Sequence, residues 1–121
     1  WLALHLDSGE KLMLFRLRAR GGEGDYLHGV LIGGDGERRA LDPSRIRLHA
    51  LRETAVAGRS LPLHWRIDLP EIGRSLELQP LHAVQWLDLD FPYWEGVVIA
   101  SGEGPGNSGR GYLELTGYAR R

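Results

Sequence analysis

Between Leu63 and Leu69 the chain alternates without a break between apolar and polar side chains. Successive side chains of a β-strand point to opposite faces of the sheet, so this period of two predicts a strand with one buried face. Elsewhere 17 glycines separate short apolar runs. No long segment keeps the helical period of about 3.6 residues. The sequence therefore predicts an all-β protein.

The same pattern recurs along the chain and predicts an ordered set of strands. They span residues 1–7, 10–19, 26–33, 38–41, 46–52, 63–69, 76–79, 93–101 and 111–119. The segments 53–60 and 82–91 are expected to be loops, with a single helical turn as the alternative for the second. About eight to ten strands in sequential hairpins would protect their edges by closing into an antiparallel barrel or by stacking as a sandwich. The whole chain, residues 1–121, is expected to be a single domain.

The first predicted hairpin decides which side chains share a face. Taking residues 8–9 as a two-residue turn places the leucines of the first strand beside Phe15 and Met13. The same pairing puts Arg16 and Arg18 on the other face, where alternating arginines are expected to be solvated.

The last predicted hairpin has one ordinary face and one unusual face. Near-symmetric pairing about the glycine-rich segment 102–109 gives a core face that carries Trp94, Val98, Leu113 and Leu115. The opposite face carries Tyr93, Glu95, Val97, Ile99, Tyr112, Glu114, Thr116 and Tyr118.

Composition excludes several functions. The 15 basic and 16 acidic side chains are balanced and scattered, which argues against nucleic-acid binding. There are 0 cysteines, so thiolate metal sites and cysteine nucleophiles are impossible. The histidines lack metal-ligand spacing, and no metal or other cofactor is expected. The sequence has no Gly-x-Ser-x-Gly elbow for a serine hydrolase, and no apolar run of about 18 residues for a membrane span.

The end of the chain carries its most specific signature. Tyr93-Trp94-Glu95-Gly96-Val97-Val98 is followed by a glycine-rich segment and then by the run from Gly109 to Tyr118. This signature resembles the AttH-like family, which includes the carotenoid hydratases called hydroxyneurosporene synthases. The opening run from Trp1 to Arg18 and the segment from Leu61 to Pro80 are similar to the same family.

The resemblance implies more than the residues show by themselves. It implies a lipocalin-like (calycin) barrel that forms the C-terminal half of a longer, two-domain protein, with an absent N-terminal lipocalin-like half as its partner. A chain that begins at Trp1 rather than Met fits this expectation. Some family members hydrate an isolated double bond of an isoprenoid. Others are envelope proteins of unknown activity, which implies a periplasmic or envelope location.

Hydration of an isolated alkene would require a carboxylic acid that protonates carbon and aromatic faces that stabilise a cation. Glu95 and Glu114 are the catalytic candidates on this view. The alternative is that this face is solvated, as alternating polar positions on a strand usually are. The candidates for ligand binding are Tyr93, Tyr112, Tyr118, Trp1, His5 and Trp65.

Three functions follow, and the first is preferred. The domain binds an apolar small molecule, a lipid or an isoprenoid, which predicts a roomy apolar interior. Alternatively, it contributes part of the active site of a cofactor-independent alkene hydratase, which predicts a buried carboxyl group beside aromatic rings. Alternatively, it is a ligand-free barrel that braces a partner domain or dimerises, which predicts a filled core and an exposed apolar face around Trp1.

Overall fold

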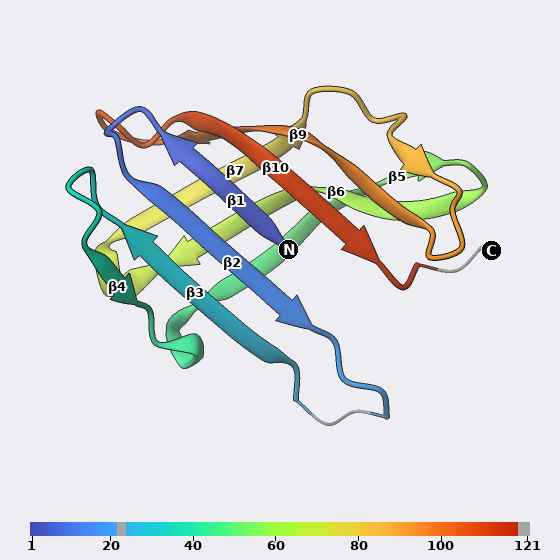
Figure 1. The fold of residues 1–121 in the computed structure, drawn as a ribbon, viewed down its shortest axis with the longest axis horizontal. Coiled ribbons are helices and arrows are strands. Elements are labelled where there is room, and N and C mark those ends of the chain that lie inside the picture. The colour runs from blue at the N-terminus through green and yellow to red at the C-terminus, as the bar shows by residue number, and fades with distance from the viewer. Residues whose placement is uncertain (22–23, 119–121) are drawn as a thin grey trace.

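The computed structural model describes residues 1–21 and 24–118. These residues form one antiparallel sheet that curls into a half-barrel (Figure 1). The strands are β1 (Leu2–Leu6), β2 (Lys11–Leu17), β3 (Tyr26–Ile32), β4 (Arg38–Ala40), β5 (Arg47–Val56), β6 (Arg59–Leu69), β7 (Arg74–Pro80), β8 (Trp86–Leu87), β9 (Tyr93–Gly102) and β10 (Gly109–Thr116). Two single-turn 3-10 helices connect strands that follow one another in the chain: η1 (Pro43–Arg45) joins β4 to β5, and η2 (Pro70–Ile72) joins β6 to β7. The all-β, lipocalin-like fold predicted from the sequence is confirmed.

The strand order brings the two ends of the chain together. It runs β4-β3-β2-β1-β10-β9-β7-β6-β5, and β8 pairs with β9 outside this path. Figure 1 shows β1 in blue lying beside β10 in red. Within the residues that the structure describes, no ladder joins β3 or β4 to β5, so the sheet remains open along that line.

One cluster of apolar side chains lies on the concave side of the sheet. The alternating side chains of β6 supply much of it, because Leu63, Ile67 and Leu69 are all less than 3% exposed. Leu4 and Leu76 from other strands are fully covered as well. Each such side chain contributes about 1.5–3 kcal/mol when it leaves water, and this burial holds the half-barrel together.

The predicted pairing of β1 with β2 is wrong by one residue. Leu2 lies opposite Leu14, and Leu4 lies opposite Leu12. The turn between them has three residues rather than two, with Gly9 at a φ of 89°. A type I turn followed by a left-handed glycine is the usual three-residue hairpin, and it shifts the register by one.

The predicted faces of the last hairpin are confirmed within β9 and β10, but Tyr118 lies beyond the end of β10 and borders the core side instead of the polar face. Glu95 lies opposite Glu114, and Trp94 lies opposite Leu115. Trp94 is completely buried, and its indole N–H donates to the Ala83 carbonyl at 2.7 Å. The core face and the polar face therefore separate as the sequence indicates.

The predicted loop at 53–60 is instead the tip of a hairpin. β5 continues to Val56 and β6 begins at Arg59, with only two residues between them. Both of those residues have positive φ, 50° at Ala57 and 72° at Gly58, as a type I′ turn requires. Alanine seldom adopts this conformation, so the sequence gives little sign of the turn. Segment 82–91 is a loop, as predicted, apart from the short strand β8.

Candidate functional site

A cavity of about 600 Å³ lies inside one end of the half-barrel. We call this end the open end; it is where β2 and β10 finish and β1 begins. The inner wall is apolar. It is formed by Leu2, Leu14, Leu48, Trp65, Ile67, Leu78, Leu113 and Leu115.

Trp65 is the largest side chain of the inner wall and is 7% exposed. Its indole N–H donates to the Pro62 carbonyl at 2.7 Å. Since its polar atom is already satisfied within β6, the ring can present carbon to the cavity at no cost in lost hydrogen bonds. Trp1 and Tyr118 border the same cavity near its mouth.

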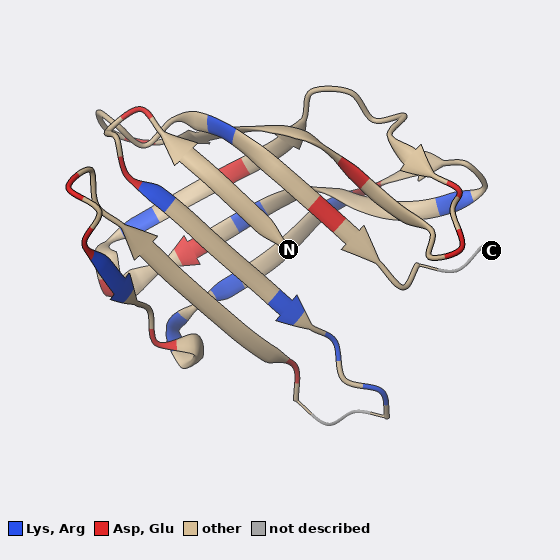
Figure 2. Cartoon of the chain, viewed as in Figure 1, with Lys and Arg blue, Asp and Glu red and all other residues tan. Residues whose placement is uncertain are grey.

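Two arginines continue the inward-facing stripe of β2 to the mouth of the cavity. Leu12 and Leu14 are buried, and Arg16 and Arg18 follow at the same period of two. Both arginines line the cavity. Figure 2 shows basic residues at the end of β2 and in the segment after it. The expectation that Arg16 and Arg18 lie on a solvated outer face is wrong, and the cause is the same one-residue shift.

Each of these arginines rests on an aromatic ring. The Arg16 guanidinium lies 5.4 Å from the centre of the Trp65 ring. Its Nε is 3.7 Å from a carboxylate oxygen of Asp25. The Arg18 guanidinium lies 4.1 Å from the centre of the Tyr118 ring, and its Nη2 donates to the Thr116 carbonyl at 2.8 Å.

The opposite end of the half-barrel is closed by charged contacts between distant segments. Arg74 at the start of β7 donates to Glu10 at the start of β2 at 2.6 Å. The bond to Arg74 is the main reason that the pKa of Glu10 is lowered from its ordinary value. Glu71 of η2 accepts from the backbone N–H of Asp42 at 2.7 Å and lies 3.4 Å from Arg39.

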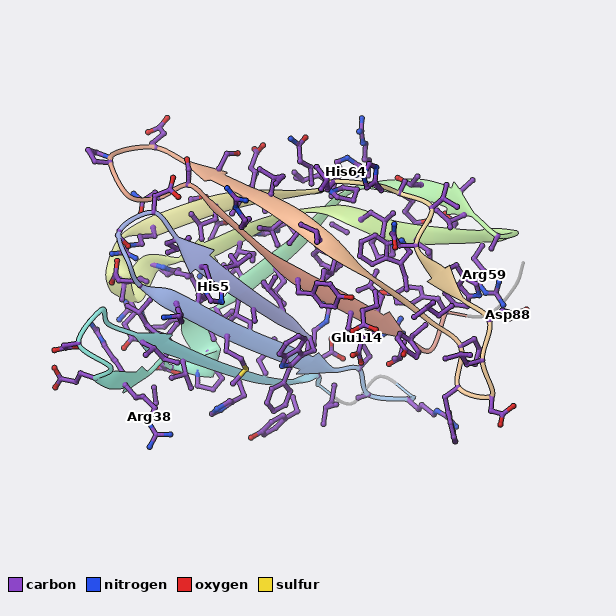
Figure 3. The ribbon with its side chains drawn as sticks, turned by 45° about the horizontal axis from the view of Figure 1, so that its top comes forward. His5, Arg38, Arg59, His64, Asp88 and Glu114 are labelled. Carbon is purple, nitrogen blue, oxygen red and sulfur yellow. The ribbon has the colours of Figure 1, made fainter. Side chains whose placement is uncertain are left out.

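The predicted catalytic residues lie on the outer face of β9 and β10. Glu95 and Glu114 are directly opposite each other, which is unfavourable for two negative charges unless other groups offset it. Tyr93 and Tyr112 lie on the same face, near enough to these carboxylates for the charge of Glu95 to act on both hydroxyls. Partial burial, and then these carboxylates, raise the pKa of both tyrosines, so their hydroxyls stay protonated as donors. Figure 3 labels Glu114 on β10.

The structure thus divides the predicted ligand-binding residues into two groups. Trp1, Trp65 and Tyr118 border the cavity. Tyr93 and Tyr112 belong to the outer carboxylate–tyrosine face, where His5 and Tyr112 also border a shallow hollow. Sequence reasoning missed the two arginines at the mouth. A correct register for the first hairpin would have found them.

Other polar clusters do not form a recognisable catalytic site. Asp68 accepts hydrogen bonds from His49 at 3.0 Å and from Ser75 at 2.7 Å. In a hydrolytic triad the serine would contact the histidine instead. Among residues 1–21 and 24–118, no three potential ligands are grouped to hold a metal ion. The same residues contain no helix long and apolar enough to span a bilayer.

Comparison with known proteins places this chain in a family. A family model described as AttH-like matches residues 1–118. The chain belongs to this family. No curated protein matches the sequence.

Two solved structures share the fold of this AttH-like chain. An AttH protein from Nitrosomonas europaea is 30% identical, with a TM-score of 0.85 over 98% of this chain and 38% of that one. Kievitone hydratase from Nectria haematococca is 17% identical, with a TM-score of 0.76 over 99% of this chain and 39% of that one. The chain therefore spans less than two-fifths of the length of either structure.

Proposed function

We propose that this AttH-like domain binds an apolar small molecule, a lipid or an isoprenoid, in the cavity at its open end. The observation that carries the proposal is a cavity of about 600 Å³ whose inner wall consists of leucines, an isoleucine and a tryptophan. Sites for small molecules usually have volumes of about 300–1,000 Å³ and apolar linings of this kind.

The closed end supports the same proposal. The contact between Arg74 and Glu10 joins β7 to the start of β2 there, so a ligand would not enter the cavity from that end. A hydrocarbon chain that lies against the inner wall removes apolar surface from water, which contributes about 25 cal/mol for each Å² buried. A ligand-free brace would instead have a filled interior, so the cavity favours binding over that alternative.

The test is a variant that fills the cavity. Leu48 is half-buried on the cavity wall, and Leu48→Trp places a large ring inside. The control, Val97→Trp, adds the same ring on the outer face of β9, where Val97 is 38% exposed. Calorimetric titration with decanol should show binding with a negative heat-capacity change, which marks burial of apolar surface.

We expect the control to bind decanol as the unmodified protein does and Leu48→Trp to bind it at least about tenfold more weakly. The far-ultraviolet circular dichroism of both variants should match that of the unmodified protein. Absence of decanol binding, or equal binding by both variants, would overturn the proposal.

A second proposal concerns the outer face of β9 and β10. We propose that Glu95 and Glu114 contribute to an active site that adds water to an alkene. Support comes from the pairing of Glu95 with Glu114 on a face that also carries Tyr93 and Tyr112. The shared fold with a protein described as a kievitone hydratase is consistent with it.

In this second proposal, one molecule of water adds across the double bond of the alkene. A carboxyl group of the pair gives its proton to one alkene carbon, the oxygen of a water molecule bonds to the other carbon, and that water returns a proton to the carboxylate. Incubation with geranylgeraniol in ¹⁸O-labelled water should yield a product heavier by one labelled water. Glu95→Gln and Glu114→Gln should abolish this product, whereas Glu77→Gln, an exposed control on β7, should not. A complete lack of labelled product would contradict the proposal.

A further inference from the structure

We propose that the cavity selects ligands that carry a carboxylate, with Arg16 and Arg18 binding the carboxylate at the mouth and the hydrocarbon part lying against the leucines inside. This inference rests on the proposed binding function and names the class of ligand. The ligand would be an acidic amphiphile rather than a neutral hydrocarbon.

The first argument is the change of character along one stripe of β2. Leu12 and Leu14 are buried in the core, and the next two inward positions are Arg16 and Arg18. A side chain at these positions borders the cavity, so the wall changes from apolar to cationic where the interior meets water. An amphiphile matches this wall, because its apolar tail would lie inside and its charged head would lie at the mouth.

The second argument is the way that the guanidinium groups are held. The guanidinium groups of Arg16 and Arg18 lie over the rings of Trp65 and Tyr118, and these cation–π contacts favour their positions at the mouth without using their N–H donors. A guanidinium offers five donors in a fork that matches a carboxylate. Among the described residues, the Arg18 side chain makes one hydrogen bond, from Nη2 to the Thr116 carbonyl, which leaves donors for a ligand.

The third argument is the balance of charge at the mouth. Within the described part of the chain, three basic side chains line the cavity: Arg16, Arg18 and Arg20. One carboxylate, Glu114, lies along the same lining, and it belongs to the outward-facing register of β10 opposite Glu95. Asp25 contacts Arg16 from outside the lining and is itself 40% exposed. The mouth therefore favours an anion over a neutral or cationic head group.

The experiment compares three ligands with the same ten-carbon chain: decanoate, decanol and decyltrimethylammonium. Calorimetric titrations at pH 7.5 should rank decanoate at least about tenfold tighter than decanol, because charge-assisted hydrogen bonds are stronger than neutral ones. The cationic ligand should bind more weakly than decanol. Arg18→Gln should remove most of the preference for decanoate over decanol.

Two further variants make the outcome specific. Arg18→Lys keeps the charge but loses the fork, so it should retain only part of the preference. Arg38→Gln, an exposed position on β4 away from the cavity, should retain all of it. Equal binding of decanoate and decanol, or an unchanged preference in Arg18→Gln, would overturn this inference while leaving the binding function intact. Binding of none of the three ligands would overturn both.

Discussion

At one end of the half-barrel Arg74 donates to Glu10 across 64 positions of sequence, while at the other Arg16 and Arg18 stack on aromatic rings beside an apolar cavity. The same strands run through both ends. At the closed end the cationic side chain meets an acid of the protein itself. At the open end Arg16 also contacts an acid, Asp25, at 3.7 Å, whereas Arg18 lies over the Tyr118 ring and its one side-chain hydrogen bond within the described residues goes to the Thr116 carbonyl. Pairing within the chain gives stability at one end, and incomplete pairing leaves binding capacity at the other.

The largest expected effect compares two leucines on one strand. Leu76 lies in the fully packed part of β7 and is 0% exposed, whereas Leu78 borders the cavity. Leu76→Ala should cost about 3–5 kcal/mol of unfolding free energy, because it creates a new void. Leu78→Ala should cost about 2 kcal/mol, since it only enlarges an existing space. Urea denaturation of both variants checks this difference, and equal losses would mean that the two ends are packed alike.

The next effect concerns the ion pair of the closed end and its dependence on pH. The pKa of Glu10 is below its ordinary 4.5 because Arg74 binds the carboxylate. Stability from this group is therefore complete above pH 4.5 and is lost as the pH falls through the folded-state pKa. Glu10→Gln should cost about 1 kcal/mol at pH 7, a modest value because both side chains are partly exposed.

Urea midpoints measured from pH 7 down to pH 2.5 test this assignment. The difference between the unmodified protein and Glu10→Gln should shrink toward zero at the acidic limit. Glu77→Gln, on the exposed side of β7, is the control and should show little difference at any pH. If the difference in urea midpoint between the unmodified protein and Glu10→Gln stayed the same in acid, the contact would stabilise the protein by packing and not by charge.

A smaller effect is expected for the pKa of His64 on β6. Desolvation first, and then the charge of Arg52, lower the pKa of His64 from its ordinary 6.5. Arg52 Nη2 lies 2.7 Å from His64 Nε2. A histidine with a lowered pKa contributes stability that is complete above pH 6.5 and declines as the pH falls from 6.5 to the folded-state value.

Arg52→Gln should raise the pKa of His64 by removing the charge while leaving the desolvation. A titration followed by nuclear magnetic resonance of the histidine ring protons measures the change. Arg47→Gln, near the other end of β5, is the matched control and should leave the His64 titration in place. An unaltered titration in Arg52→Gln would mean that desolvation alone sets the pKa.

The smallest effect is expected in the loop before β9. Phe91 is 85% exposed and Val84 is 84% exposed. Phe91→Ser should change the unfolding free energy by no more than about 0.5 kcal/mol, as for most surface substitutions. Thermal melting checks this value. A loss of 2 kcal/mol or more of unfolding free energy would show that the Phe91 side chain packs against the protein in solution. The loop would then stabilise the fold, as the contacts of the closed end do.

Sequence patterns predicted the fold where alternation alone decides the structure. The apolar side chains of β6 and the two faces of the last hairpin follow directly from a period of two. The patterns failed where a turn sets the register, because three residues rather than two join β1 to β2. That single shift moved Arg16 and Arg18 from the expected outer face to the mouth of the cavity. The cavity could not be predicted, since its volume depends on how far β2 and β6 lie apart.

The lack of pairing between β4 and β5 affects how the protein behaves at high protein concentration. A strand with unpaired backbone groups can recruit a strand from another molecule and begin an aggregate. The edge strand β4 is only three residues long, and two of them, Arg38 and Arg39, are exposed cations. The other edge, β5, is interrupted by a bulge near Leu51. The short length and the charge of β4, and the bulge of β5, make these edges poor templates for a strand of another molecule. The sheet can therefore stay open without promoting aggregation.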